Sequence, residues 1–295
     1  MRDRSAAPAR GQQGKAEVVV GEQQSVRQQE VADSAELRPE IPHPARMYDY
    51  YLGGKDNFPA DREAAERALA ANPEFRSTAR ANRGFLQRAV RHVAQQGVDQ
   101  FLDIGTGIPT AGNTHEIAQQ VDPQARVVYV DNDPIVLTHA RALMAGMGRG
   151  RTHVMQADLR DPAGILAAAQ VRELLDFDRP VALVLAAVLH FVPEEDEPYR
   201  IVAELLAALA PGSYLVLSHG TADFIPPEVR DRVTGVYTKA TAPLVGRSRA
   251  EVRQFFDGLE LLEPEVVTVP LWRPEAEPTQ GADRVSMYGG VARKG

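Results

Sequence analysis

Between residues 100 and 218, short apolar segments alternate with longer segments of helical character. Short apolar strands separated by helices predict a parallel sheet that is covered on both faces. Two of the helices begin with an Asp-Pro pair, in which the acid caps the helix and proline takes its first position. The predicted strands are Gln100–Ile104, Arg126–Val130, Thr152–Gln156, Val181–Ala186 and Tyr214–Ser218, and the predicted helices between them are Ala111–Gln120, Pro134–Met147, Pro162–Leu175 and Tyr199–Ala210.

The segments on either side of this region complete the predicted fold. Before it, apolar residues at helical spacing predict helices over Ala60–Ala71 and Pro73–Gln96. After it, a helix with the capping box Ser248…Glu251 precedes two strands, Leu261–Val269 and Arg284–Ala292, which are expected to pair as an antiparallel hairpin at a sheet edge. We therefore predict an α/β fold: a Rossmann-like, doubly wound sheet of seven strands, mostly parallel, with an N-terminal helical cap.

Composition narrows the class of protein. Residues 1–41 are rich in Gln, Glu, Arg, Ala and Ser without apolar periodicity, which predicts a disordered tail. A single domain is expected over 42–295, with a lid and helices at 42–98 and the Rossmann-like core at 99–295. The chain shows no apolar signal-peptide core and no stretch long enough to cross a bilayer, and its net charge of −7 disfavours non-specific nucleic-acid binding. A cytoplasmic protein without membrane contact is expected.

The segment FLDIGTGIPT, residues 101–110, predicts a ligand site where the first strand ends. The strand delivers Asp103 into a turn with Gly105 and Gly107, where the absence of Cβ lets a ligand approach the backbone. The N-terminus of the following helix is expected to add unpaired N–H donors. Asp103 repels a dinucleotide pyrophosphate and attracts an ammonium group, and Thr110 stands where the dinucleotide fingerprint has its third glycine. The pattern therefore favours S-adenosylmethionine (SAM), without a metal.

Two further acids follow the next two strands. Asp131 ends the second strand at the edge where doubly wound sheets bind ligands, and is predicted to accept hydrogen bonds from both ribose hydroxyls. Asp133 fits the role of a helix cap better. Asp158 follows the third strand, where it either accepts from the adenine 6-amino group or is an ordinary loop carboxylate. Because three successive strands end in acids, their carboxylates are expected at one edge of the sheet.

Several motifs carry a resemblance to a known family: PARMYDYYLGGKDNF, ARANRGFLQRAVR, FLDIGTGIPT, VVYVDNDPIVL, QADLRDP and VLHFVP. The core resembles the class I SAM-dependent methyltransferases, and residues 44–294 resemble an actinobacterial S-adenosyl methyltransferase family first catalogued as a domain of unknown function. The resemblance implies that Asn132 flanks the adenine and that Leu159 donates its backbone N–H. The predicted cofactor-binding residues are Tyr48, Arg83, Asp103, Ile104, Gly105, Thr106, Gly107, Asp131, Asn132, Ala157, Asp158, Leu159 and Ala186.

The N-terminal motif and one arginine extend this predicted site. The motif joins the aromatic area around Tyr48 to a flexible Gly53-Gly54 elbow, which predicts a lid over the cofactor, an apolar strap on the sheet, or both. Arg83 lies on the apolar stripe of its helix and needs an anionic partner. The methionyl carboxylate of SAM is one candidate partner, and Asp49 or Asp56 is another.

The fourth strand leads to His190, the predicted catalytic residue. Methyl transfer depends mainly on alignment, and a base matters only when the acceptor carries a proton, so His190 is interpreted as a base or as a wall residue. The segment lacks the Asn/Asp-Pro-Pro-aromatic tetrad of enzymes that methylate base amines. We predict SAM-dependent methyl transfer to a small molecule at O or N, with acceptor contacts from residues 220–245. The alternatives are a non-catalytic SAM-binding or partner-binding module and an NAD(P)-dependent oxidoreductase.

Overall fold

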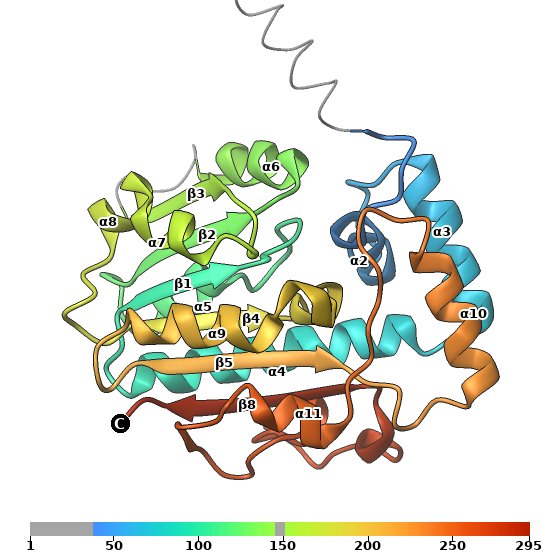
Figure 1. The fold of residues 1–295 in the computed structure, drawn as a ribbon. Helices are drawn as coiled ribbons and strands as arrows, with labels where there is room; N and C mark the ends of the chain where they lie inside the picture. The colour runs from blue at the N-terminus through green and yellow to red at the C-terminus, as the bar shows by residue number, and fades with distance from the viewer. Residues whose placement is uncertain (1–37, 145–150) are drawn as a thin grey trace, which may run out of the picture. The chain divides into compact units, whose positions relative to one another are not determined.

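An eight-stranded sheet forms the centre of the fold in the computed structural model, which describes residues 38–144 and 151–295. The strands follow the order β3-β2-β1-β4-β5-β8-β6, with β7 also paired to β8 (Figure 1). Strands β1 to β5 are parallel, and β8 runs antiparallel to its neighbours. The strands are β1 (Gln100–Ile104), β2 (Arg126–Asp131), β3 (Thr152–Gln156), β4 (Ala182–Ala186), β5 (Tyr214–Gly220), β6 (Glu260–Leu261), β7 (Val267–Thr268) and β8 (Met287–Arg293).

Helices cover both faces of this sheet, as the alternating pattern predicts. Because successive side chains of a strand point to opposite faces, Phe101 of β1 packs among the residues of α4 and α5, whereas Leu102 packs among those of α7, α8 and α9. The helices are α2 (Pro44–Leu52), α3 (Pro59–Ala71), α4 (Phe75–Gln95), α5 (Thr114–Val121), α6 (Pro134–Met144), α7 (Pro162–Ala167), α8 (Ala169–Leu174), α9 (Pro198–Ala207), α10 (Pro227–Tyr237) and α11 (Arg249–Gln254), with 3-10 turns η1 (Leu189–Phe191), η2 (Glu194–Asp196), η3 (Val269–Leu271) and η4 (Ala282–Arg284).

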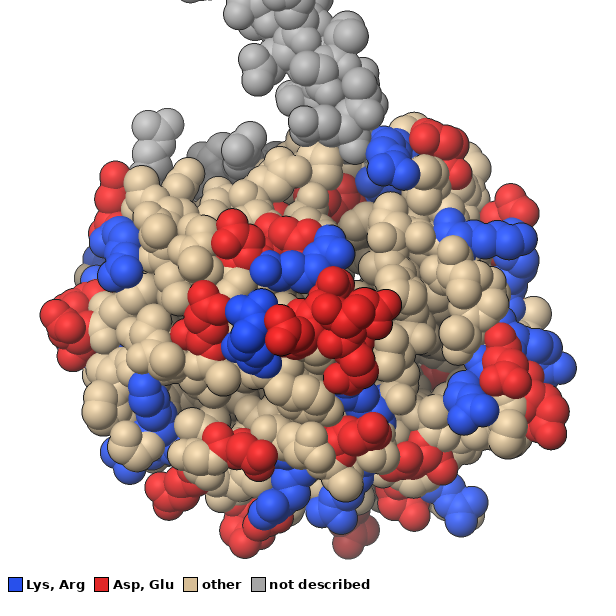
Figure 2. All heavy atoms as spheres, in the orientation of Figure 1, with Lys and Arg blue, Asp and Glu red and all other residues tan. Residues whose placement is uncertain are grey.

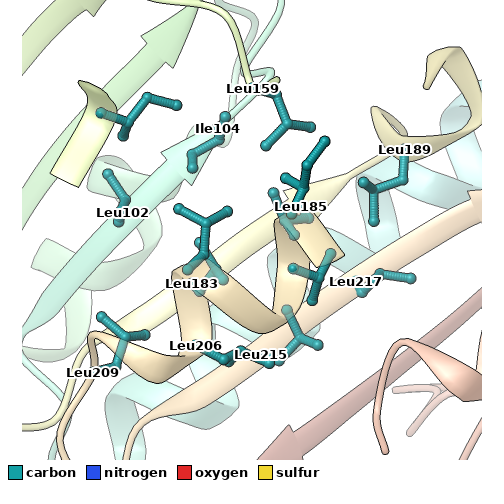
Figure 3. Packing of buried hydrophobic residues seen from close by; sticks show 14 of the residues in the cluster. Leu102, Ile104, Leu159, Leu183, Leu185, Leu189, Leu206, Leu209, Leu215 and Leu217 are labelled. Carbon is teal, nitrogen blue, oxygen red and sulfur yellow. The ribbon is translucent and has the colours of Figure 1, made fainter. Parts of the chain in front are cut away.

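Leucines fill the space between the sheet and α9 (Figure 3). Leu183 and Leu185 of β4 stand in register with Leu215 and Leu217 of β5, and all four side chains are fully buried. Burying one such side chain stabilises a fold by roughly 1.5–3 kcal/mol. The packed strands give the rigid edge on which the site residues are held.

A second group of helices lies at the end toward which the arrows of β1 and β5 point (Figure 1). It joins α2 and α3, drawn in blue, to α10, drawn in orange, which comes from a distant part of the sequence. Their contact buries Met47 and Tyr51 of α2, Ala68 of α3 and Val233 of α10. The predicted N-terminal helical cap is therefore present. Helix α10 joins it from the segment between β5 and α11, where no helix was predicted.

Two predictions of element structure are wrong in detail. The strand expected at Leu261–Val269 is divided into β6 and β7, so the sheet has eight strands instead of seven. Between them Pro264 has no N–H to donate, and Glu265 turns the chain with a positive φ of 64°. The helix expected at Pro162–Leu175 is two helices, because Ala168 adopts ψ 137° between them.

The ends of two other predicted segments fall where the structure gives no description. The tail predicted at residues 1–41 lies outside the described residues apart from 38–41, and the predicted helix Pro134–Met147 is described only as far as Met144. The division into a tail and one domain therefore stays a prediction. In the part of the chain that is described, no helix is both long and apolar enough to pass through a membrane.

Candidate functional site

The ends of β1, β2 and β4 border a cavity of about 390 Å³. Parallel strands of a doubly wound sheet present their carboxyl ends at one edge, so residues far apart in sequence meet there. His190 is absent from the lining and borders a second, smaller cavity. The larger cavity is lined by all the residues predicted to bind the cofactor, namely Tyr48, Arg83, Asp103, Ile104, Gly105, Thr106, Gly107, Asp131, Asn132, Ala157, Asp158, Leu159 and Ala186.

The glycine turn after β1 has the backbone that only glycine adopts without strain. Gly105 and Gly107 have φ values of 75° and 64°. A Cβ on Gly105 would lie 2.3 Å from a methyl carbon of Val188, whereas a Cβ on Gly107 would meet no atom within 4 Å. The first glycine is therefore required by packing, and the second leaves open space beside the cavity.

The helix that follows this turn differs from the prediction. It begins at Thr114, and the N–H groups at its start already have partners inside the protein. Glu116 accepts from the N–H groups of Gly112 and Asn113, and the Tyr129 hydroxyl accepts from that of His115. The prediction that this helix terminus offers unpaired donors to a ligand is wrong for these three groups. The capping box that Asn113 and Glu116 form is the physical reason.

Asp103 is a buried carboxylate with a raised pKa. It is 5% exposed, and its Oδ2 accepts from the Thr114 hydroxyl at 2.6 Å. Burial raises the pKa of Asp103 to about 6, against the opposing influence of the Thr114 hydrogen bond and of the Arg83 charge. The charged form of a buried carboxylate with a raised pKa is stabilised when a cation is placed beside it.

Asp131 holds the glycine turn as well as facing the cavity. Its Oδ2 accepts from the N–H of Gly107 at 2.8 Å, and its Oδ1 accepts from the N–H of Asp133 at 2.9 Å. Burial raises the pKa of Asp131 to about 6 in spite of these hydrogen bonds. The carboxylate oxygens are acceptors with remaining lone pairs, as a contact with hydroxyl groups requires.

Asp133 is the predicted helix cap, and it has a second role that the sequence did not indicate. Its Oδ1 accepts from the N–H of Ile135 in the first turn of α6. The same carboxylate accepts from Arg46 of α2, at 2.8 Å from Nε, and both side chains are almost fully buried. This pair fixes α2 to the loop that follows β2.

Asp158 lies in the loop after β3 with Arg160 as its partner. Arg160 donates from Nε to Oδ1 at 2.9 Å and from a terminal nitrogen to Oδ2 at 2.6 Å. These hydrogen bonds lower the pKa of Asp158. The contact with adenine stays a prediction, and any adenine amino group would share this carboxylate with Arg160. The sequence signal was the spacing Asp158-Leu159-Arg160, which brings both side chains to one side of a turn.

Arg83 does not pair with the two acids that were offered as its partners. Asp49 accepts instead from the backbone N–H of Asp56 and from the side chain of Asn57. Arg83 donates from one terminal nitrogen to the carbonyl of Gly112 at 3.0 Å. Its Nε is buried and has no hydrogen-bond partner among the described residues, although the side chain lines the larger cavity. Of the alternatives for Arg83, a ligand carboxylate is the one that remains open.

The segment around Tyr48 is a helix, α2, that ends at the glycine pair. Gly53 caps the helix with φ 87°. A Cβ on Gly54 would lie 1.9 Å from the Asp49 carboxylate, so close packing explains this glycine. The glycine pair therefore ends a packed helix, which agrees with the strap interpretation, while Tyr48 also lines the larger cavity as the lid interpretation expects.

A chain of hydrogen bonds connects Tyr48 to the ends of two strands. The Tyr48 hydroxyl accepts from the amide nitrogen of Asn82 at 3.0 Å and donates to a backbone carbonyl. The Ser218 hydroxyl donates to the Asn82 oxygen at 2.6 Å and accepts from the N–H of Ala187 at 2.9 Å. Ala187 has the left-handed φ of 57°, which is costly for a residue with a Cβ. The chain thus holds a strained residue at the wall of the larger cavity.

The second cavity has a volume of about 90 Å³ and lies beside the first. Pro44, Tyr48 and Phe191 line both cavities, so the two adjoin at these residues. Its other walls come from α4, α10, the residues after β5 and the start of β8. Residues 220–246 contribute much of the lining, where the sequence predicted acceptor contacts at 220–245.

His190 lies at the wall of this smaller cavity with its basic nitrogen occupied. The N–H of Gly220 donates to Nδ1 of His190 at 3.1 Å, so the neutral ring carries its proton on Nε2. Burial, with a smaller contribution from Arg247, lowers the pKa of His190 to about 3. In this arrangement His190 offers a hydrogen-bond donor at neutral pH.

Arg247 organises the neighbourhood of His190, and sequence analysis missed it. The guanidinium is almost fully buried, donates to the carbonyls of Leu189 and Val192, and pairs with Glu194 at 2.6 Å. It also donates to Nε2 of His219, whose Nδ1 proton goes to the carbonyl of Gly220. His219 is therefore a packing residue. The only sequence signal was an arginine that directly precedes a helix capping box.

Acidic groups outnumber basic ones around the larger cavity. Figure 2 shows acidic side chains gathered near the middle of the viewed face. Asp103, Asp131, Asp158, Glu195 and Asp196 line the cavity, against the guanidinium groups of Arg83 and Arg160. Such a lining opposes a diphosphate and suits a ligand with positive charge.

Comparison with known proteins gives the family. A family model described as S-adenosyl methyltransferase matches residues 30–295. A DUF574 family protein from Streptomyces avermitilis has 49% identity, a TM-score of 0.83, and a match over 88% of this chain and 100% of its own. A candidate methyltransferase from Thermobifida fusca has 41% identity, a TM-score of 0.81, and a match over 88% of this chain and 97% of its own.

The curated proteins give no match. The family description names SAM as the cofactor and methyl transfer as the activity, in agreement with the strand-end acids and the glycine turn. With a match over most of its length, this chain belongs to the S-adenosyl methyltransferase family.

Proposed function

We propose that the protein transfers the methyl group of SAM to a small-molecule acceptor at an oxygen or nitrogen atom. The observation that carries this proposal is the junction of the two cavities at Pro44, Tyr48 and Phe191. A donor in the larger cavity and an acceptor in the smaller one would meet at these residues. A transferase needs this geometry, whereas a module that only binds SAM needs one cavity.

The larger cavity suits SAM in size and in chemistry. Its volume of about 390 Å³ is in the usual range for small-molecule sites. The unpartnered Nε of Arg83 would donate to the methionyl carboxylate. Asp103 would face the ammonium group, and Asp131 would accept from the ribose hydroxyls. Each charged or polar part of SAM thus has a complementary group in the lining.

The protein's contribution to the reaction is alignment. SAM, when bound, supplies a methyl group on a positively charged sulfur, which leaves with the electrons of the S–C bond. Holding the acceptor in line with that bond can lower the barrier by roughly 7–11 kcal/mol. Tyr48 and Phe191 stand at the junction, where their rings would border both the methyl donor and the acceptor.

His190 contributes a donor and not a base in this proposal. Its only lone pair accepts the Gly220 N–H, and its low pKa leaves it neutral at physiological pH. A proton released by the acceptor would therefore pass to water. This arrangement favours acceptors that react as an anion or as a neutral amine.

Binding and turnover separate this proposal from its alternatives. We expect Arg83→Gln to weaken binding of S-adenosylhomocysteine (SAH) by about 10-fold to 100-fold, because a charge-assisted hydrogen bond is lost. Arg80→Gln is the matched control, since Arg80 lies exposed on the same helix and lines neither cavity. Isothermal titration calorimetry measures both variants. Equal affinity in the two variants would remove Arg83 from the site.

Turnover is followed with methyl-labelled SAM and a mixture of small metabolites. Label transfer that Arg83→Gln reduces and Arg80→Gln does not is the expected result. SAH binding without any transfer would favour the non-catalytic module. Tight binding of NADH with no SAH binding would favour the oxidoreductase, which the acidic lining opposes.

A further inference from the structure

We propose that the smaller cavity selects a single-ring aromatic acceptor that carries an oxygen hydrogen-bond acceptor and is neutral or negatively charged. This inference rests on the proposed function, because it names the class of molecule that would receive the methyl group. Three independent features of the cavity support it: its aromatic walls, its surplus of hydrogen-bond donors, and the sign of the charge in its lining.

Aromatic rings in mutual contact form one part of the cavity wall. Tyr51 and Phe75 stack with centroids 5.2 Å apart, and Phe75 lies 6.5 Å from Tyr237. Phe191 lies 5.9 Å from Tyr237 on the side that borders the larger cavity. Rings arranged in this way offer faces and edges to a further planar ring, which gains more from them than an aliphatic group of equal size.

The volume limits the ligand to one ring. The cavity measures about 90 Å³. An apolar cavity that holds benzene measures roughly 150 Å³. The smaller cavity therefore takes at most one ring, which would extend through the junction toward the larger cavity, and a second fused ring has no room. The junction at Tyr48 and Phe191 then places one ring substituent toward the larger cavity.

The two buried tyrosines supply a hydrogen that has no acceptor. The hydroxyls of Tyr51 and Tyr237 lie 3.1 Å apart, and only one of their two hydrogens is used in that contact. The other finds no acceptor among the described residues. Burial raises the pKa of both phenols, that of Tyr237 to about 12, so both keep their hydrogens at neutral pH. A buried donor left without a partner is costly, and a ligand oxygen would satisfy it.

His190 adds a second donor, which is uncharged at neutral pH. Its Nε2 carries the proton and makes no hydrogen bond within the described part of the chain. No Asp or Glu is among the described residues that line the cavity. Arg230 of α10 is the charged residue there, and its exposed guanidinium lies 3.4 Å from the Asp231 carboxylate, outside the lining. The lining thus offers donors and one positive charge, which suits an oxygen-bearing ring and opposes an aromatic ammonium ion.

The chemistry of transfer to such a ring balances without a protein base. A lone pair on the oxygen substituent of the ring forms the new bond to the methyl carbon, and the S–C bond breaks with both electrons on sulfur. A phenol loses its proton to water, and a phenolate or carboxylate has none to lose. The free tyrosine hydrogen, His190 and Arg230 all favour the anionic form of the ring.

The test uses the full protein saturated with SAH, which first confirms that the larger cavity works. Binding of 4-hydroxybenzoate, cyclohexanecarboxylate and tyramine is then compared by ligand-observed NMR. We expect 4-hydroxybenzoate to bind at least about 10-fold more tightly than the other two, since one lacks the ring and the other carries a positive charge. Failure of SAH to bind would count against the proposed function. Normal SAH binding with a preference for the aliphatic acid or the amine would overturn this inference alone.

Variants locate the ring in the cavity. Thr234→Trp fills the space and should abolish 4-hydroxybenzoate binding while SAH still binds, because Thr234 lines only the smaller cavity. Thr238→Trp, exposed on the same helix end, should change neither. Unchanged binding of 4-hydroxybenzoate to Thr234→Trp would place the ring elsewhere and overturn the inference.

Two further comparisons test the donors and the charge. Tyr51→Phe and Tyr237→Phe each leave one free hydroxyl and should bind 4-hydroxybenzoate within about twofold of the parent, whereas the double variant should lose about 3-fold to 10-fold. Arg230→Gln should weaken binding by up to about 5-fold at low salt, and Arg232→Gln, exposed and outside the lining, should not. A double variant that binds as tightly as the parent would contradict the role of the free hydrogen.

Discussion

The two adjoining cavities are built in different ways. The larger one is formed by turns and acids that directly follow successive strands, so its chemistry is written in short continuous motifs such as FLDIGTGIPT. The smaller one combines the segment that follows β5 with single side chains from α2, α4, η1, α10 and β8, which no local pattern connects. The difference teaches that a cofactor site is readable from a sequence where the backbone itself is the binding surface.

The buried acids near the larger cavity also differ in their environment. Asp103 and Asp131 are buried without a cation within ion-pair distance among the described residues, and burial raises the pKa of each to about 6. Asp133, two residues further on, is equally buried but pairs with Arg46 of α2. The two acids of the cavity lining thus have no cation beside them in the described part of the chain, whereas Asp133 holds the helix that lines both cavities.

The largest effect on stability is expected for the contact between Asp133 and Arg46, because this contact holds the helix that lines both cavities. Asp133→Asn removes the carboxylate that faces Arg46 and should lower the free energy of unfolding by about 3 kcal/mol or more, because breaking a buried ion pair is costly. Glu63→Gln is the control, since Glu63 pairs with Arg67 at the surface and should cost less than about 1 kcal/mol. Urea unfolding measures both. Similar losses would mean that α2 is held by other contacts.

A smaller effect, in this case an increase in the free energy of unfolding, is expected for a substitution that affects the larger cavity alone. The folded-state pKa of Asp103 is raised, so the folded protein binds a proton more tightly than the unfolded chain, and its stability falls as pH rises through about 6. Asp103→Asn keeps the shape without the charge. It should gain about 1–3 kcal/mol of stability relative to the parent at about pH 7.5, and no gain at about pH 4, while SAH affinity falls about 10-fold.

Denaturant unfolding at the two pH values, with calorimetry of SAH binding, checks this prediction. A variant that is less stable than the parent at the higher pH would show that the Asp103 charge is compensated inside the protein. A gain of equal size at both pH values would show that the difference lies in packing and not in titration.

The smallest effect is expected at the junction. Tyr48→Phe keeps the ring that lines both cavities and removes the hydroxyl that accepts from Asn82. It should lower the free energy of unfolding by about 1 kcal/mol, the usual value of one hydrogen bond, and change SAH affinity by less than about threefold. Thermal unfolding and calorimetry measure the two quantities. A larger loss of affinity than of stability would show that the strained backbone at Ala187, to which the hydroxyl is connected, matters for binding.

Periodicity predicted the sheet well because the central strands β1, β2, β4 and β5 are buried on both faces and each connecting helix has one apolar face. The predicted bounds of Gln100–Ile104 and Thr152–Gln156 agree with β1 and β3. Periodicity failed at Leu261–Val269, where apolar residues stand on both sides of the turn that Pro264 and Glu265 impose. Apolar spacing indicates which residues are buried. A turn with apolar residues on both sides therefore gives nearly the same pattern as one continuous strand.

The candidate site was predictable in so far as its residues follow strands. The strand-end acids and the glycine turn needed only the rule that parallel strands share an edge. Arg46, Arg247 and the Tyr51–Tyr237 pair were out of reach, because each depends on a partner more than 50 residues away in sequence. Burial of an arginine cannot be inferred until the carboxylate or carbonyls that receive it are known.

Because α2 is a wall of both cavities, a ligand in one that orders this helix would favour binding in the other. Whatever free energy the first ligand spends in immobilising Tyr48 and its neighbours is saved by the second, and reciprocity requires the saving to be equal in either order. Departure of the demethylated cofactor would then loosen the hold on the methylated product as well. One short helix would in this way couple the retention of one ligand to the retention of the other.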